Sequence, residues 1–141
     1  MSLLLARAAV NDANIHFDRL YSYLIPAQLV GKVYPGSMVL VPFGRGNKAR
    51  MAVVLAVEEA EETDAPQRLK SLYDAAPEEA RLTPDLLELV RFLKERTFCT
   101  WFEAVKAVIP YGAQYRPATV DGRPVMQSRL TRSTEKLYKL A

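Results

Sequence analysis

Aromatic and basic side chains gather in two short stretches in the first third of the chain. Residues 20–26 read Leu-Tyr-Ser-Tyr-Leu-Ile-Pro, and residues 39–46 read Val-Leu-Val-Pro-Phe-Gly-Arg-Gly. We expect each to be a strand, the first ended by its proline and the second running into a glycine-rich turn. This arrangement brings aromatic faces, free backbone amides and positive charge to one end of a small β-structure. Single-stranded nucleic acid is the ligand that best uses all three.

The candidate side chains of this end divide into aromatic and basic groups. The aromatic ones are Tyr21, Tyr23 and Phe43, and the basic ones, expected to contact a DNA backbone, are Arg45, Lys48 and Arg50. Stacking of a base on an aromatic face contributes about 1–3 kcal/mol, and cations neutralise phosphates. Core packing is the alternative for the rings, because Tyr21 and Tyr23 face the same side of one strand.

Composition places the chain among ordinary globular proteins. It has 141 residues, of which 50% are hydrophobic and 25% charged, enough for one domain and an appendage. No apolar run reaches the roughly 20 residues of a membrane span, and the N-terminus does not have the pattern of a signal peptide. We therefore expect a cytoplasmic protein that does not contact a membrane.

The net charge of +3 is spread unevenly along the sequence. Residues 1–57 carry six basic and two acidic residues, residues 58–112 seven and twelve, and residues 113–141 six and two. A basic first segment beside an acidic middle favours an anion-binding face.

Few residues offer catalytic or metal-binding chemistry. Cys99 and His16 are the only cysteine and histidine, so no intrachain disulfide and no thiolate zinc cluster can form. The turn at 44–48 lacks the Gly-Lys-Ser/Thr ending of a phosphate loop and is not followed by a helix pattern. The acidic run at 58–64 is typical of a solvated loop. We expect no catalysis, metal or cofactor in this chain.

The hydrophobic pattern predicts strands at 3–10, 20–25, 37–43 and 49–57, and one more short strand at 68–73. A hairpin loop at 44–48 and a polar loop at 58–67 connect them. Thr83 and Thr100 are candidate caps for two helices, the first ending near Arg96 and the second before Pro110. The fold class is mainly β with C-terminal helices (α+β): a small antiparallel OB-like barrel followed by two helices.

Beyond residue 112 the sequence becomes polar and weakly patterned. We expect a small hairpin around Asp121 and Gly122 and a helix that is only starting at residues 130–138. An amphipathic pattern that stops with the chain indicates a piece of a longer protein.

The order of these motifs resembles the N-terminal region of the PriA family, the bacterial primosomal replication-restart DNA helicases. The motifs are Tyr-Ser-Tyr-Leu-Ile-Pro, Val-Leu-Val-Pro-Phe-Gly, Leu69-Lys70 and a helix opened by Leu-Thr-Pro and followed by Val-Ile-Pro. The resemblance covers about residues 3–112. It implies a 3′-DNA-binding domain at 1–112, with a barrel at 1–74 and a helical part at 82–110. Residues 113–141 would be a linker and the start of a truncated winged-helix domain.

The resemblance implies a pocket for the 3′ end of a nascent leading strand at a stalled fork. Its residues would be Tyr21, Ser22, Tyr23, Gly44 and Lys70. The rings would stack the last base, the glycine would allow a sugar close to the backbone, and the lysine would pair with the terminal phosphodiester. Ser22 departs from the family, where an acid is common. Because a neutral hydroxyl binds a 3′-hydroxyl less strongly than a carboxylate does, we expect weaker end selectivity.

Partners and cofactors follow from the same resemblance. It implies DNA 3′ ends and forks, the rest of the PriA chain, other primosome proteins and single-strand-binding protein as partners. ATP, magnesium and zinc would belong to the missing helicase part, so this chain would have no helicase activity. The alternative is a protein-interaction module that docks a replication partner or the helicase body, and it would show little salt-dependent DNA binding.

Overall fold

A computed structural model of the protein describes residues 2–11, 19–61, 69–77, 80–109 and 115–128. His16, the acidic residues 62 and 64, Pro110 and the helix expected at 130–138 lie outside the described residues. Within the described ranges, no helix is both long and apolar enough to cross a membrane.

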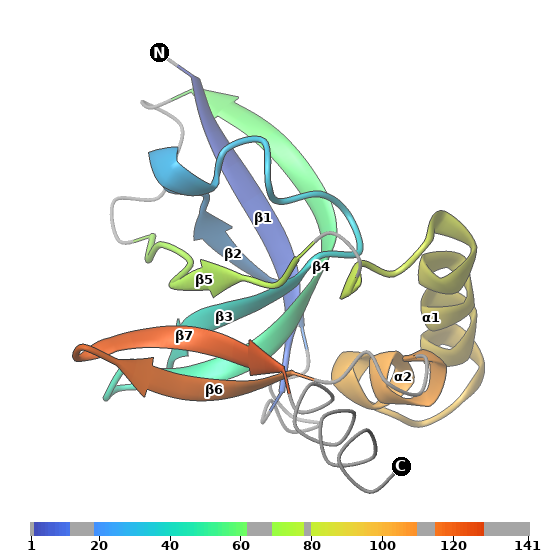
Figure 1. The fold of residues 1–141 in the computed structure, drawn as a ribbon. Helices are drawn as coiled ribbons and strands as arrows, with labels where there is room; N and C mark the ends of the chain where they lie inside the picture. The colour runs from blue at the N-terminus through green and yellow to red at the C-terminus, as the bar shows by residue number, and fades with distance from the viewer. Residues whose placement is uncertain (1, 12–18, 62–68, 78–79, 110–114, 129–141) are drawn as a thin grey trace, which may run out of the picture.

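An antiparallel sheet forms the centre of the molecule (Figure 1). Its strands are β1 (Ser2–Val10), β2 (Tyr21–Leu24), β3 (Met38–Phe43), β4 (Lys48–Glu61) and β5 (Asp74–Ala75). Their order across the described sheet is β2-β1-β4-β3-β5. The strands expected at 3–10, 20–25, 37–43 and 49–57 are confirmed, and so is the α+β class.

The fourth strand is longer than its sequence indicates. The prediction of a loop from residue 58 is wrong for its first four residues, because β4 continues through Glu61. Its acidic end pairs with the start of β1, where Ser2 lies opposite Glu61 and Leu5 opposite Glu58. Backbone pairing with the apolar strand β1 therefore keeps these polar residues extended. Their local sequence alone would favour a loop.

Residues 69–76 form a joining segment that hydrogen-bonds to β2 on one side and to β3 on the other. On one side, the Leu24 amide donates to the Lys70 carbonyl at 2.8 Å and the Leu72 amide donates to the Leu24 carbonyl at 3.1 Å. On the other side, the Tyr73 amide donates to the Leu40 carbonyl at 2.8 Å. The short strand expected at 68–73 is thus wrong in its position, since the strand residues proper are 74–75. Because β2 and β3 contact the same segment, the sheet curls as an OB-like barrel requires.

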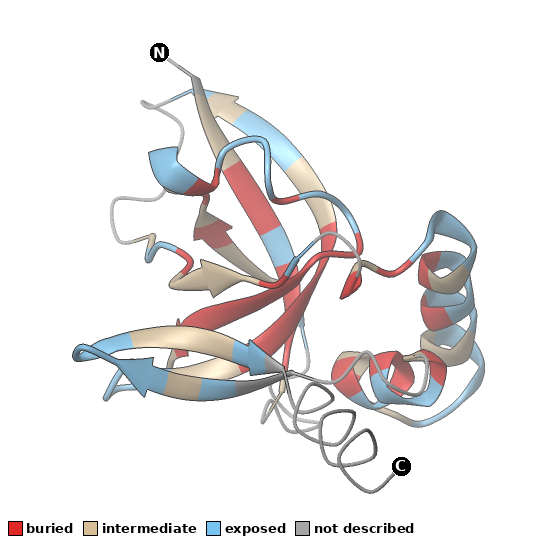
Figure 2. Cartoon of the chain, viewed as in Figure 1, coloured by how far each residue is buried: buried red, intermediate tan, exposed pale blue. Residues whose placement is uncertain are grey.

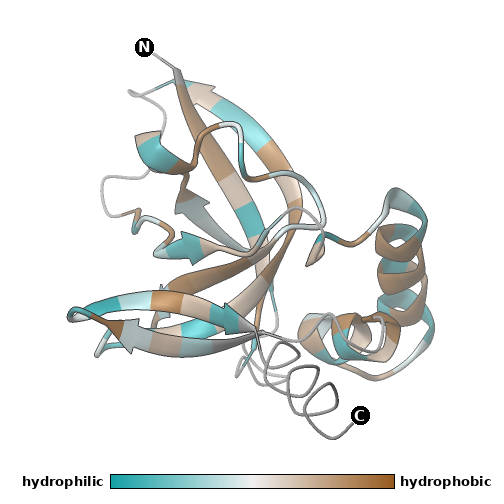
Figure 3. Ribbon diagram, in the orientation of Figure 1, coloured by the Kyte–Doolittle hydropathy of each residue, from teal (hydrophilic) through white to brown (hydrophobic). Residues whose placement is uncertain are grey.

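The sheet is covered on both faces, which explains its nearly continuous apolar strands. Alternate residues of β3 and β4 enter two separate cores. One core, inside the curved sheet, contains Val39, Val41, Ala52, Val54 and Tyr23. The other lies between the sheet and the helices and contains Leu40, Met51, Val53, Val90 and Val105. Accordingly β3 is coloured as buried in Figure 2 and as hydrophobic in Figure 3.

Both expected helices are present with their expected caps. Helix α1 (Pro84–Arg96) starts at Thr83, whose side chain accepts from the Leu86 amide. Helix α2 (Trp101–Val108) starts at Thr100, which forms a reciprocal capping box with Glu103. A short 3-10 helix, η2 (Ala27–Leu29), lies in the connection between β2 and β3.

The hairpin expected around Asp121 and Gly122 is confirmed and is longer than predicted. Strands β6 (Tyr115–Val120) and β7 (Arg123–Ser128) pair across a turn in which Asp121 has φ 51° and Gly122 φ 75°. The Met126 amide donates to Asp74 Oδ2 at 2.8 Å, so β7 is attached to β5 of the barrel. The domain boundary near residue 112 and the winged-helix assignment stay predictions.

Candidate nucleic-acid interface

A cavity of about 180 Å³ opens at one edge of the barrel. Its wall residues come from three elements: Tyr21, Ser22 and Tyr23 of β2, Pro42, Phe43 and Gly44 at the end of β3, and Leu69 and Lys70 of the joining segment. The structure therefore brings together the five residues expected in a pocket, Tyr21, Ser22, Tyr23, Gly44 and Lys70. Pro42 and Leu69 were not expected there.

The edge of β2 presents backbone groups to this cavity. Along an antiparallel strand, successive residues bond alternately to one side and to the other. Leu24 bonds outward to the joining segment and Ile25 bonds inward to the Leu4 carbonyl, so Ser22, two residues before Leu24, directs its N–H and C=O outward. The described part of the joining segment bonds to Leu24 and not to Ser22. The N–H donor and the C=O acceptor of Ser22 thus lie side by side at the cavity wall.

Tyr23 is a buried residue of the wall and connects two strands of the barrel. Its side chain is only 4% exposed, and its hydroxyl donates to the Pro42 carbonyl at 3.0 Å. This bond joins β2 to β3, which are not neighbours in the sheet. Burial, with a smaller contribution from Tyr21, raises the pKa of Tyr23 to about 12, so the ring is neutral at physiological pH.

Tyr21 forms the outer aromatic wall together with Phe43. The two rings meet edge to face, with centroids 5.2 Å apart and planes at 89°. The Arg19 guanidinium lies 4.9 Å from the centroid of the Tyr21 ring, in cation–π geometry. Arg19 was not expected in the site. It stands two positions before Tyr21, and residues two apart in an extended chain lie on the same side, so this spacing could have indicated its place.

The turn after β3 forms the opposite wall and is held at both ends by the joining segment. Gly44 has φ 77°, and a Cβ on it would meet no atom within 4 Å, so the backbone is open to a ligand. Lys70 Nζ donates to the Gly44 carbonyl at 3.2 Å, and the Tyr73 hydroxyl donates to the Asn47 carbonyl at 2.9 Å. Because an ammonium has three donors, Lys70 can still bind an anion.

The three cations expected on a DNA backbone lie beside the cavity and not in its wall. Arg45 is exposed in the turn, and Lys48 is exposed at the start of β4, opposite Phe43. Arg50 is half-buried opposite Val41, and its Nη1 donates to the Ala49 carbonyl at 3.3 Å. Their contact with DNA stays a prediction.

The chemistry of the cavity suits a ligand with a planar part and a negative charge. It offers aromatic rings, an outward-facing backbone donor and acceptor, and a lysine, while none of its described wall residues is acidic. A nucleotide combines a base, hydrogen-bonding edges and a phosphate.

The comparison with known proteins agrees with this chemistry. Residues 9–110 match the family described as the PriA 3′DNA-binding domain (3′BD). The chain belongs to this family. The resemblance read from its motifs is therefore confirmed, and membership of the PriA family assigns the chain a DNA-binding role.

Two replication restart proteins PriA illustrate the relationship. The chain is 29% identical over 100 residues to the protein of Chlamydia trachomatis serovar D and 30% identical over 107 residues to that of Bacillus subtilis. These stretches are 69% and 74% of the chain but only 13% of each relative. The similarity thus concerns one domain of PriA.

Proposed function

We propose that the cavity between the β2 edge and the Gly44 turn binds the 3′-terminal nucleotide of a DNA strand. One observation carries this proposal: five residues separated by up to 49 positions in the sequence, from Tyr21 to Lys70, line a single cavity whose described wall residues include no acid. A pocket that is open on one side and ends at a wall favours chain ends, because an internal nucleotide has a phosphate on both sides and must continue past the wall.

Each wall has a distinct task in this proposal. The aromatic wall of Tyr21 and Phe43 stacks the base or sugar. The outward N–H and C=O of Ser22 pair with a base edge, and since every base carries donors or acceptors, this contact tolerates different sequences. Lys70 binds the last phosphodiester with the donors that Gly44 leaves free.

In the complete protein this domain would hold the nascent leading strand at a stalled fork while a helicase part works beside it. That part, with its ATP, magnesium and zinc, would lie in the remaining length of a PriA-like chain acting in the cytoplasm. Other primosome proteins and single-strand-binding protein are the further partners that we propose for it.

A direct test compares a linear oligonucleotide that has a free 3′-hydroxyl with a circular one of the same composition, by fluorescence anisotropy. We expect the linear strand to bind at least several-fold more tightly and Lys70→Ala to remove most of this preference. Lys106→Ala, an exposed lysine of α2, is the matched control and should keep it. Equal affinity for both strands in the unmodified protein would contradict the proposal.

A second candidate, a protein-docking module, is favoured by exposed apolar side chains around the end of α1. Leu89 is 42% exposed, Phe92 52% and Phe98 fully, and these residues are not in the cavity. In that case the oligonucleotide experiment would show weak binding with little salt dependence, and Lys70→Ala would change nothing.

A further inference from the structure

Arg7 of β1 lies next to the cavity, one strand away from its wall. It is paired with Ser22 of β2, the residue whose backbone faces the cavity. The alternation of hydrogen bonds described above makes this a non-hydrogen-bonded pair, and side chains in such pairs lie on the same face with Cβ atoms about 4.5–5.5 Å apart. A guanidinium thus sits one strand away from the cavity, on the outer face of the sheet.

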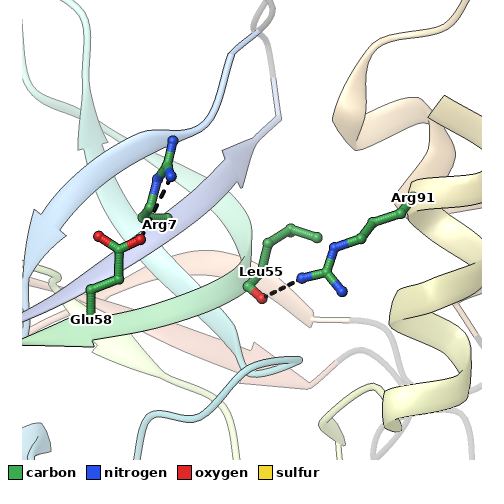
Figure 4. A network of polar contacts seen from close by, with 4 residues as sticks. All are labelled: Arg7, Leu55, Glu58 and Arg91. Atoms are coloured by element: carbon green, nitrogen blue, oxygen red, sulfur yellow. Dashed lines mark hydrogen bonds and ion pairs between the residues drawn. The ribbon is translucent and has the colours of Figure 1, made fainter. Parts of the chain in front are cut away.

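In the structure Arg7 is held by a carboxylate. Its Nη1 lies 3.6 Å from Glu58 Oε1, and the two side chains are 44% and 52% exposed (Figure 4). Exposed ion pairs of this kind contribute about 0–1 kcal/mol, and salt screens them. A phosphate, which accepts two parallel hydrogen bonds from an arginine, can therefore displace Glu58 at little energetic cost.

A β-bulge brings Glu58 to the face of Arg7. The pairing of β1 with β4 shifts between Arg7 and Ala8, so that Arg7 lies opposite Ala56 and Ala8 opposite Val54. Leu55 is the extra residue. Without it, Leu55 and Val57 would share the face of Arg7, whereas the observed register places Ala56 and Glu58 there. The carbonyl of Leu55 accepts from Arg91 Nη2 at 3.2 Å, which ties the bulge to α1 (Figure 4).

We propose that Arg7 is a second phosphate-binding residue for the strand whose end enters the cavity, and that Glu58 occupies it in the free protein and competes with the DNA. This inference rests on the proposed function of the cavity. Its ligand is a backbone phosphate of single-stranded DNA near the 3′ end. Arg7 has a carboxylate partner in Glu58, which makes its contribution separable by mutation of either residue.

The experiment measures the affinity of the chain for the linear oligonucleotide over a series of salt concentrations. We expect Arg7→Gln to weaken binding several-fold and to reduce the slope of log K against log salt by about 0.7, the contribution of one phosphate contact to a single strand. We expect Glu58→Gln to strengthen binding, but only while Arg7 is present. Arg123→Gln, an exposed arginine of β7, should leave the salt slope unchanged.

Glu59→Gln is the control for charge alone, because it removes the same charge from the opposite face of β4. It should change affinity less than Glu58→Gln does. Unchanged affinity and slope in Arg7→Gln, while Lys70→Ala still weakens binding, would overturn the inference and leave the proposed function standing. Equal effects of Glu58→Gln with and without Arg7 would also overturn it. If Lys70→Ala has no effect and circular DNA binds as well as linear DNA, the proposed function itself fails.

Discussion

Lys70 and Tyr73 fix the turn that forms one wall of the cavity. Their side chains bind the carbonyls of Gly44 and Asn47, so the turn is anchored before any ligand arrives. The glycine needs a positive φ there, 77°, and Asn47, at 50°, is a residue type that tolerates one. A prearranged wall reduces the conformational entropy that the protein itself loses when a ligand binds.

Burial of Tyr23 makes the free energy of unfolding depend on pH in the alkaline range. Its pKa is raised from 10.0 to about 12 in the folded chain, chiefly by burial. Between these values the unfolded chain loses the proton while the folded chain keeps it, so the free energy of unfolding is highest below pH 10 and falls as the pH rises towards 12. A difference of two units corresponds to roughly 2–3 kcal/mol.

Urea unfolding at a series of pH values checks this expectation. The unmodified protein should lose stability over that window more steeply than Tyr23→Phe. The variant should start about 1 kcal/mol less stable, since the Pro42 carbonyl loses its partner. Identical pH dependence in the two proteins would show that Tyr23 is not the group responsible.

At the scale of elements, the contact of α1 with the bulge of β4 positions the strand on which Glu58 lies. Arg91→Met keeps the aliphatic part of the side chain but removes the bond to the Leu55 carbonyl. We expect a loss of about 1 kcal/mol in the free energy of unfolding, because a partly buried acceptor loses its donor. Chemical denaturation measures it, with Glu88→Gln on the exposed side of α1 as the control. Equal stability of the Arg91 variant and the unmodified protein would contradict the role given to this bond.

Elements with local signals could be predicted from the sequence, and those that depend on distant pairing could not. Thr83, Thr100 and the Asp121-Gly122 turn specify their helices and hairpin within a few residues. By contrast, the extension of β4 to Glu61 depends on pairing with β1, and the position of β5 depends on the curl of the whole sheet.

The same distinction applies to the cavity. Tyr21 and Tyr23 were expected from the residue pattern and Ser22, Gly44 and Lys70 from the resemblance to the PriA family, and the structure places all five together. The roles of Pro42, Leu69 and Arg7 depend on how the joining segment closes the barrel and on the register between β1 and β2. Neither the closure of the barrel nor the strand register can be predicted from neighbouring residues. The sequence therefore did not indicate these three residues.

At the scale of the whole molecule, the barrel and the helices share one core while the cavity lies at the barrel edge. The helix-facing core joins Leu40, Val53, Val90 and Val105, and none of these residues lines the cavity. Exposed wall residues such as Lys70 can therefore vary without change to the helix-facing core, whereas Tyr23 belongs both to the wall and to the core inside the barrel. In the protein-docking alternative, the exposed apolar residues near the end of α1 would contact the partner.

The most direct measurement of the central claim follows backbone amide signals by NMR during titration with a short oligonucleotide that has a free 3′-hydroxyl. We predict that the largest shifts occur at Ser22, Gly44 and Lys70, with smaller ones at Arg7. A 3′ end bound in this cavity must perturb the outward amide of Ser22. Shifts confined to α1 and α2, with these amides unchanged at saturation, would contradict the account.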